Sequence, residues 1–289
     1  MSTGTLAPAG TEDPSPAAPA RAGLLAGRRG LVLGVVNQRS IAWGIARRLA
    51  AEGAELGFTY RASSAGQWLR RATPRLVADG AEAPYLGHCD VLEEGALERV
   101  CAEFAERHGG IDFVVHAVAH ADKDELAGGL ASTSRSGFTH AMESSVYSLI
   151  GLAGAVRPYL TPNASVLTLS YLGAERVCHG YNVLGVAKAA LESAARYLAA
   201  ELGPSGTRVN VLSAGPVRTL ATFGLPNFAA SLAQRAERSP LGRPITTEDV
   251  AGTALYLLSD LSSGTTGETV YVDAGYHMMG TWPGDAGHG

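Results

Sequence analysis

Residues 30–53 have the sequence GLVLGVVNQRSIAWGIARRLAAEG, in which an apolar run passes through a glycine turn into a helical pattern. The run at 30–36 is rich in Val and Leu, which predicts a buried strand. Gly34 lets the backbone approach a phosphate closely, and a helix that begins after Ser40 presents free N–H groups to an anion. The spacing to Gly44 is not the strict G-x-G-x-x-G pattern. A phosphate-binding turn and a tight turn without a ligand therefore both fit this segment.

The alternation of apolar runs and longer helical patterns continues along the chain. We expect strands at 30–36, 54–60, 83–91, 111–118, 165–171, 207–215 and 268–275. We expect helices near 41–52, 64–79, 93–108, 134–158, 181–202 and 246–259. Strands that alternate with helices and are apolar nearly throughout are typical of a parallel sheet covered on both faces. The sequence therefore predicts one α/β domain, a Rossmann-type doubly wound sheet of seven parallel strands with helices on both faces.

Length and composition agree with one domain that has a sizeable core. The chain has 289 residues, 46% of them hydrophobic, and its net charge of −4 with scattered basic residues argues against nucleic acid as a partner. We expect a disordered Ala/Pro-rich tail at 1–26, the folded domain at 27–280 and a flexible C-terminus at 281–289. Segment 216–240 looks irregular and follows a strand, which suits a lid over a substrate, although a surface helix pair fits equally well.

Cysteine usage and hydropathy bear on metals and on the compartment. The chain has three cysteines, an odd number without metal-ligand spacing: Cys89, Cys101 and Cys178. We therefore expect neither a disulfide framework nor a metal site. The sequence shows no signal peptide and no run long enough to span a bilayer. A cytoplasmic protein without membrane contact is the resulting expectation.

The ends of the second, third and fourth strands suit a dinucleotide. The second strand ends in Arg61 without an acid nearby, which favours NADPH over NADH because an arginine accommodates a 2′-phosphate; a solvated loop arginine is an equal alternative. Asp90 and Val91 follow the third strand, where the carboxylate could accept from adenine or cap a helix. Three small or apolar residues after the fourth strand would let the backbone pass close to the cofactor: Ala117, Val118 and Ala119.

Two tyrosines and a lysine lie in residues 170–199, SYLGAERVCHGYNVLGVAKAALESAARYLA. Tyr181 and Lys188 are seven positions apart, so a helix would place them on one face, about 10.5 Å apart along its axis. A phenol and an ammonium group on one face could polarise a carbonyl while holding a dinucleotide. Tyr171 precedes them at a strand end. For this segment alone, a solvated helix face is the alternative.

Several motifs together resemble the short-chain dehydrogenase/reductase superfamily and, within it, the bacterial enoyl-acyl-carrier-protein reductases. They are GVVNQRSIAWGIA, CDV, SYLGAERVCHGYNVLGVAKAALE, RVNVLSAGPVRTLA and GETVYVDAGYHMMG, and the resemblance covers about 27–280. In the wider superfamily the catalytic tyrosine precedes the lysine by four positions, where this chain has Leu184. The wider pattern's serine would be Thr168. The seven-residue spacing therefore points to the enoyl-reductase branch.

The resemblance implies reduction of the carbon–carbon double bond of a trans-2-enoyl thioester by NADPH or NADH, in fatty-acid elongation, on acyl carrier protein or coenzyme A. It implies that Tyr181 stabilises the enolate oxygen, that Lys188 binds the nicotinamide ribose and that Tyr171 lines the substrate pocket. It assigns further cofactor contacts to Ser40, Ile41, Pro216, Val217 and Thr219. It also implies a homotetramer.

Three departures from the family pattern lie near the expected acyl pocket. His120 stands where the family often has an aromatic residue, His179 and Gly180 replace Pro-Asn, and Leu184 replaces a usual Met on the same wall. We expect His120 and Leu184 to contact substrate. The histidines leave open a specialised enoyl-thioester or enoyl-CoA reductase of a natural-product pathway.

Two other functions stay open at this stage. One is a carbonyl reductase of the same superfamily, which the spacing disfavours, and the other is a dinucleotide-binding sensor without chemistry. For His116, at the end of the fourth strand, a structural role is more common than a catalytic one.

Overall fold

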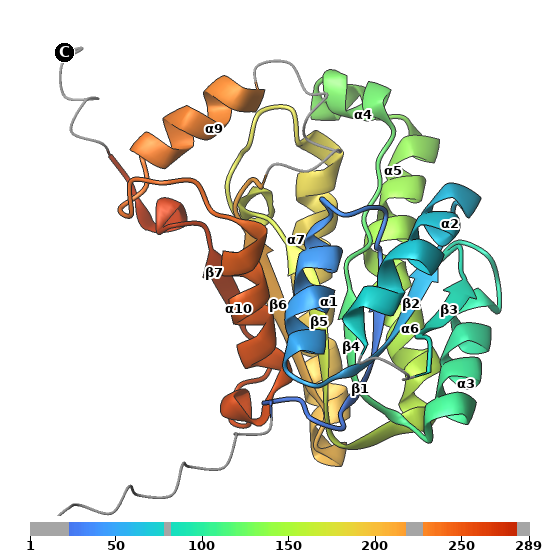
Figure 1. The fold of residues 1–289 in the computed structure, drawn as a ribbon. Coiled ribbons are helices and arrows are strands. Elements are labelled where there is room, and N and C mark those ends of the chain that lie inside the picture. The colour runs from blue at the N-terminus through green and yellow to red at the C-terminus, as the bar shows by residue number, and fades with distance from the viewer. Residues whose placement is uncertain (1–22, 78–81, 218–227, 282–289) are drawn as a thin grey trace, which may run out of the picture.

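Seven strands form one sheet in the order β3-β2-β1-β4-β5-β6-β7, and every adjacent pair is parallel (Figure 1). The computed structural model describes residues 23–77, 82–217 and 228–281. The strands are β1 (Arg29–Leu33), β2 (Glu55–Tyr60), β3 (Tyr85–His88), β4 (Ile111–His116), β5 (Leu160–Ser170), β6 (Arg208–Ala214) and β7 (Thr269–Val272). The predicted Rossmann-type doubly wound sheet is confirmed.

Helices pack on both faces of the sheet (Figure 1). They are α1 (Ile41–Ala51), α2 (Ser63–Ala72), α3 (Ala96–His108), α4 (Lys123–Ala127), α5 (Arg135–Met142), α6 (Ser148–Val156), α7 (Asn182–Leu202), α9 (Phe228–Glu237) and α10 (Thr247–Leu258). Apolar residues of α1, α2 and α10 form the core on one face. Those of α3, α6 and α7 form the core on the other. Both faces of the central strands β1, β4 and β6 are thus buried, which explains why the sequence shows continuous apolar runs there.

Two predicted helices differ from the observed ones. The helix predicted at 134–158 consists of α5 and α6 joined by a π-helical turn, Glu143–Tyr147. The helix predicted at 64–79 ends at Ala72 and continues as a 3₁₀ turn, Thr73–Leu76, where a proline removes a backbone donor. Local register changes of this kind leave the apolar period almost unchanged, so the sequence did not reveal them.

Two further helices lie outside the six predicted helices. α9 lies within segment 216–240, for which an irregular lid and a surface helix pair were both open, and residues 218–227 of that segment lie outside the described part of the chain. α4 has only five residues, too few to show a helical period.

The N-terminal boundary of the domain lies earlier than residue 27. Leu25, which was expected in the disordered tail, is fully buried, and its N–H donates to the Glu52 carbonyl oxygen at 3.0 Å. Residues 1–22 and 282–289 lie outside the described part of the chain. The folded unit therefore includes at least residues 23–26 of the predicted tail.

The chain reverses its winding direction beside β1. β1 pairs with β2 on one side and with β4 on the other, so the loops that leave β1 and β4 part above the sheet. Ligands of doubly wound sheets bind in the crevice at such a point. Gly34, directly after β1, has a φ of +90°. A Cβ there would lie 2.1 Å from the Ala117 carbonyl oxygen, so only glycine allows this approach.

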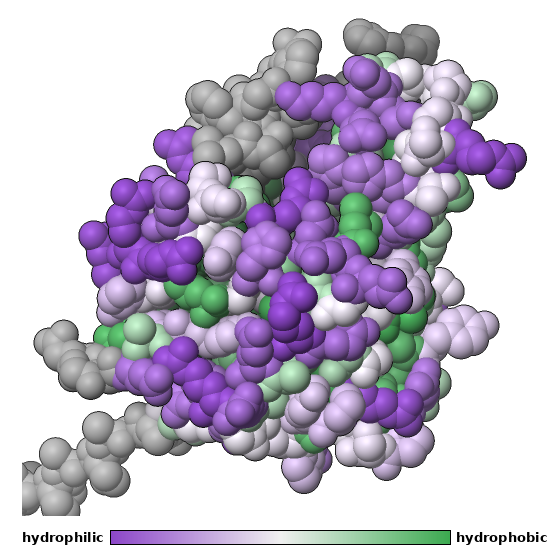
Figure 2. All heavy atoms as spheres, turned by 90° about the vertical axis from the view of Figure 1, so that its right-hand side faces the viewer, coloured by the Kyte–Doolittle hydropathy of each residue, from purple (hydrophilic) through white to green (hydrophobic). Residues whose placement is uncertain are grey.

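The surface and the helices bear on membrane contact. Within residues 23–77, 82–217 and 228–281, no helix combines the length and the apolar composition needed to cross a bilayer. The face that carries α2 and α3 is mostly hydrophilic, with apolar residues in small groups (Figure 2).

Candidate active site

A cavity of about 270 Å³ lies at the carboxyl ends of β1, β2, β3 and β4. Its lining includes eight residues that the sequence predicted for cofactor or substrate: Gly34, Arg61, Asp90, Val91, Ala117, Val118, Ala119 and His120. Thr59, Tyr60, Cys89 and Ser144 also line it, although the sequence pattern did not single them out. The structure thus brings four separate loops of the predicted site to one place. A site at this edge of a doubly wound sheet is the usual position of a nucleotide.

Ser40 and Ile41 lie at the start of α1. Ser40 is the N-cap residue: its Oγ accepts from the Trp43 N–H at 3.3 Å and donates to the Asn37 carbonyl oxygen at 2.7 Å. A capped first turn still leaves N–H groups without a partner inside the helix. The start of α1 therefore suits the pyrophosphate contact that was predicted for Ser40 and Ile41.

Asp90 and Arg61 have different local roles. Asp90 Oδ1 accepts from the Leu92 N–H at 3.1 Å, which stabilises a turn, while α3 has Gly95 as its N-cap. The helix-capping alternative for Asp90 is therefore wrong. Arg61 is exposed, and in the described part of the chain only its backbone carbonyl oxygen has a hydrogen-bond partner, His88 Nε2 at 3.1 Å. Its guanidinium group is thus available to a ligand of the cavity.

Tyr181 lies directly before the N-terminus of α7 and not within the helix. It is the N-cap of α7, and Asn182 follows with a φ of +31°, held by its side-chain amide to the carbonyl oxygens of Leu126 (3.0 Å) and Gly128. The geometric prediction that Tyr181 and Lys188 share one regular helix face is therefore wrong at its first residue. Sequence reasoning missed Asn182, although asparagine is one of the few residues that tolerate a positive φ.

The hydroxyl group of Tyr181 is a proton donor at neutral pH. Burial raises its pKa well above the ordinary value, and the neighbouring Tyr171 adds to this shift. The two rings meet edge to face with centroids 4.7 Å apart. A Cβ on Gly173 would lie 2.4 Å from the Tyr181 ring, so the loop after β5 packs closely against that ring. The phenol is thus both protonated and fixed in place.

Tyr171 is bound from the opposite side by α9. Its hydroxyl group accepts a hydrogen bond from Arg235, and the Arg235 guanidinium carbon lies 5.6 Å from the ring centres of both Tyr171 and Tyr276. Burial raises the pKa of Tyr171 to about 12, while the charge of Arg235 opposes this. The sequence suggested a lid at 216–240 but contained no signal for this arginine.

Lys188 is buried, with an exposed fraction of 5%. Its Nζ donates to the Leu169 carbonyl oxygen, at the carboxyl end of β5, at 2.7 Å. An ammonium group has three donors, and within the described residues Leu169 is its only hydrogen-bond acceptor. Burial lowers the pKa of Lys188 to about 8, and Glu192 opposes this shift. The ammonium group is charged at neutral pH and keeps donors for the hydroxyls of a nicotinamide ribose.

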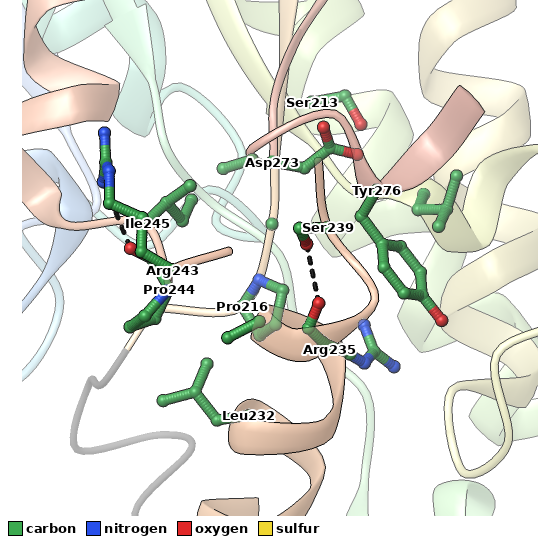
Figure 3. A pocket seen from close by; sticks show the side chains of 14 residues that line it. Ser213, Pro216, Leu232, Arg235, Ser239, Arg243, Pro244, Ile245, Asp273 and Tyr276 are labelled. Atoms are coloured by element: carbon green, nitrogen blue, oxygen red, sulfur yellow. Dashed lines mark hydrogen bonds between the residues drawn. The ribbon is translucent and has the colours of Figure 1, made fainter. Parts of the chain in front are cut away.

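Two of the remaining predicted positions, Pro216 and His179, line two further cavities beside α9. Pro216 lines a space of about 20 Å³ together with Arg235, Asp273 and Tyr276 (Figure 3). Val217 is buried, and Thr219 lies outside the described residues. A second cavity, of about 400 Å³, is lined by residues that include Arg176, Cys178, His179, Arg235, Arg238 and Tyr276. His179 is therefore not grouped with His120, and half-buried Leu184 lines none of these three cavities.

The π-helical turn holds the loop after β4. Ser144 Oγ donates to the His120 carbonyl oxygen at 3.0 Å, and Ser145 Oγ accepts from the His120 N–H at 3.2 Å. The ring centroids of His120 and His140 are 5.1 Å apart. Asp122 Oδ1 lies 3.4 Å from His120 Nε2, and Asp122 Oδ2 lies 3.7 Å from His140 Nδ1. His120 thus belongs to a polar group at the edge of the first cavity.

His116 has a structural role. It is fully buried, with Nδ1 2.9 Å from Thr168 Oγ1 and Nε2 2.9 Å from Ser148 Oγ. Burial lowers its pKa to about 3, so the ring is neutral. Thr168 therefore binds His116 inside the protein.

A doubly wound parallel sheet with a cavity at its switch point, and with a tyrosine and a lysine at the carboxyl end of the neighbouring strand β5, defines a dinucleotide-dependent oxidoreductase. A family model described as enoyl-(acyl carrier protein) reductase matches residues 34–277. The chain belongs to this family.

Named relatives support the same assignment. Enoyl-(acyl-carrier-protein) reductase (NADH) 1 of Rhizobium meliloti is 48% identical over 264 residues, 91% of this chain and 95% of the relative. The crystal structure of the enoyl-(acyl-carrier-protein) reductase (NADH) from Aquifex aeolicus has a TM-score of 0.84 at 44% identity and covers 90% of this chain and all of that one. The Bacillus cereus enoyl-acyl carrier protein reductase, solved with NADP+ and indole naphthyridinone, has a TM-score of 0.86 at 43% identity, with 90% and 100% coverage.

The close approach at Gly34 leads to a first prediction. Gly34→Ala places a methyl group against the Ala117 carbonyl oxygen at a positive φ, so we expect it to lower the free energy of unfolding by about 2 kcal/mol. NADH binding should weaken about tenfold or more because the loops of the cavity shift apart. Thermal melts and fluorescence titration with NADH measure the two effects.

A glycine in open space provides the control. Gly252 lies in α10, and among the described residues no group outside the adjacent helix backbone lies within 4 Å of the place that a Cβ would take there. Gly252→Ala should therefore stabilise the helix by about 0.5–1 kcal/mol. NADH binding that is equally strong in both variants would show that the Gly34 turn does not shape the cavity.

Proposed function

We propose that this chain reduces the carbon–carbon double bond of a trans-2-enoyl thioester carried by acyl carrier protein, with hydride from a nicotinamide dinucleotide. The observation that carries the proposal is the placement of two groups at the carboxyl end of β5. They are half-buried Tyr181, whose phenol is protonated, and buried Lys188, whose ammonium group is charged. The residue four positions before the lysine, Leu184, has no titratable group. That spacing favours enoyl reduction over the carbonyl reduction of the wider superfamily.

Tyr181, Lys188 and the cofactor have separate tasks in the proposed reaction. The bound cofactor supplies the hydride that goes to the β-carbon of the enoyl thioester. The Tyr181 hydroxyl group donates a hydrogen bond to the thioester oxygen, where negative charge gathers as the enolate forms. Lys188 donates to the ribose hydroxyls and adds positive potential. A proton from solvent then completes the α-carbon.

Tyr171 and Arg235 would shape the acyl site. The arginine holds the Tyr171 hydroxyl group, and the edge-to-face contact of Tyr171 holds the Tyr181 ring. Because the contact with Arg235 comes from α9, a helix within the predicted lid region also orders the reacting end of the pocket. Tyr171 is therefore proposed as a substrate-lining residue with a secondary role.

A specialised thioester substrate is the second candidate. It is favoured by the polar group of His120, Asp122 and His140 at the edge of the first cavity, where the family often has an aromatic residue. A polar edge of this kind suits an acyl chain that carries a hydroxyl or carbonyl group. Turnover of hydroxylated enoyl thioesters in preference to saturated-tail ones would favour this candidate.

For the cofactor, we infer NADH as the main nucleotide, with NADPH accepted. The sequence favoured NADPH because of Arg61, but the relatives from Rhizobium meliloti and Aquifex aeolicus carry NADH in their names. A structure of the Anaplasma phagocytophilum relative holds NAD, and that from Bacillus cereus holds NADP+. Arg61, exposed at the cavity, supports a contact to a 2′-phosphate when NADPH binds.

The role of Tyr181 is tested by removing its hydroxyl group. Tyr181→Phe should lower kcat about 10²- to 10³-fold with crotonyl thioester, while the KM for NADH stays unchanged, because the lost interaction forms only as charge develops on oxygen. Tyr197→Phe is the control, since it removes a hydroxyl group from the exposed face of the same helix. Full turnover of Tyr181→Phe would refute the assigned role.

The cofactor inference is tested at Arg61. Arg61→Gln should lower kcat/KM for NADPH about tenfold by removing the charge that faces the 2′-phosphate, and leave NADH within about twofold. Steady-state assays with both nucleotides on one enoyl thioester measure this. An equal loss for the two nucleotides would mean that Arg61 does not contact the 2′-phosphate.

We also propose that the chain forms a homotetramer. Large apolar side chains are exposed on α6, on α7 and on the turn before α6: Ile150, Val186 and Tyr147. The residues of the edge strand β7 are only half-buried. Apolar helix faces of this kind are typical of contacts between subunits.

Sedimentation or light scattering tests the assembly. We expect a mass four times that of the chain, and Ile150→Glu should reduce it because a charge would be buried between subunits. A monomer at micromolar concentration would contradict the proposal.

A further inference from the structure

Lys188 and Glu192 are two buried side chains of opposite charge on α7. They lie one helical turn apart and are 5% and 6% exposed. Lys188 donates to the Leu169 carbonyl oxygen at 2.7 Å, and Ser170 Oγ donates to Glu192 Oε1 at 2.5 Å. Two consecutive residues at the carboxyl end of β5 therefore hold two charged groups of α7.

A carboxylate buried to this extent destabilises a protein unless it is paired. Ser170 provides Glu192 with one hydrogen bond. Burial raises the pKa of Glu192, and Ser170, Arg196 and Lys188 act in the opposite direction. Lys188 shows the reverse: burial lowers its pKa to about 8, and Glu192 is the group that raises it. Each charge therefore makes the other tolerable in the interior.

We propose that Glu192 is a positioning residue for Lys188: its carboxylate, fixed by Ser170 one helical turn away, supplies the negative charge that keeps the ammonium group charged at the carboxyl end of β5, where the nicotinamide ribose would bind. This inference rests on the proposed function, because it assumes that Lys188 contacts the cofactor. Glu192 itself lies one turn further along α7 and is not a catalytic residue.

Other titratable groups around the pair do not replace Glu192. His116 faces Lys188 but is neutral, because burial lowers its pKa to about 3. Tyr271, on β7, is neutral because burial and the nearby Glu175 raise its pKa, and Glu192 adds to this shift. Glu175 and Arg196 both act on Glu192, with opposite signs. In the described part of the chain, Glu192 is the carboxylate that raises the pKa of Lys188 and so favours its charged form.

The test is the pH dependence of NADH binding, measured by fluorescence titration without enoyl substrate. A lysine is charged below its pKa, so binding to the wild-type chain should weaken as the pH rises through about 8. Glu192→Gln removes the charge while keeping the shape and an acceptor for Ser170. We expect the pH at which binding weakens, the alkaline limb of the profile, to fall by about one unit. NADH binding should then be about fivefold weaker at pH 8 and little changed at pH 6.

Three variants separate positioning from packing. Glu192→Asp keeps the charge and should restore the limb in part, which also covers the case that Glu192→Gln does not fold. Ser170→Ala frees the carboxylate and should shift the limb less than Glu192→Gln. Glu201→Gln is the matched control on the same helix, since Glu201 is exposed and pairs with Arg157 at 2.9 Å. It should leave the pH profile unchanged.

The outcomes are distinct from those for the proposed function. An alkaline limb in Glu192→Gln at the wild-type pH, with or without a lower melting temperature, would overturn the positioning role. Absence of enoyl reduction by the wild-type chain would overturn the proposed function, while the shift in NADH binding could still be measured.

Discussion

The contact between the backbones of Gly34 and Ala117 is the constraint on which the site depends. The Ala117 N–H donates to the Leu33 carbonyl oxygen at 3.2 Å, so the pairing of β1 and β4 continues one residue beyond the strands before the loops separate. A side chain at position 34 has no room. The loops after β1 and β4 therefore separate at a fixed point, and residues of both loops line the first cavity at the carboxyl edge of the sheet.

Burial prepares the two main functional groups in opposite ways. Water removal disfavours charge in both, so the Tyr181 hydroxyl group holds its proton more tightly while Lys188 releases its proton more easily. The phenol keeps the form that the chemistry needs, a neutral donor, and the adjacent Tyr171 acts in the same direction as burial. The lysine needs a compensating carboxylate, and the packing of α7 against β5 places Glu192 and Ser170 to supply one.

The sequence predicted the sheet and most of the first cavity because both follow from chain order. A residue directly after a parallel strand must lie at the carboxyl edge, so Gly34, Arg61 and Asp90 could be placed without coordinates. Contacts between distant elements could not be predicted. Arg235 reaches Tyr171 across 64 positions, and no local pattern distinguishes this arginine from a solvated one. The prediction that Tyr181 lies within a regular helix failed because Asn182 has a positive φ, so α7 begins at Asn182 instead of Tyr181.

The π-helical turn has a consequence for the length of the chain between α5 and α6. Ser144 and Ser145 bind the backbone of His120, and Ser148, just beyond the turn, binds His116. Each residue of a helix rotates the following side chain by about 100°. Loss of one residue from the turn would rotate Ser148 away from His116 while Ser144 kept its place. The extra residue of the π turn therefore sets the two ends of the β4 loop in register, and homologous chains with this loop should tolerate substitutions here more readily than deletions.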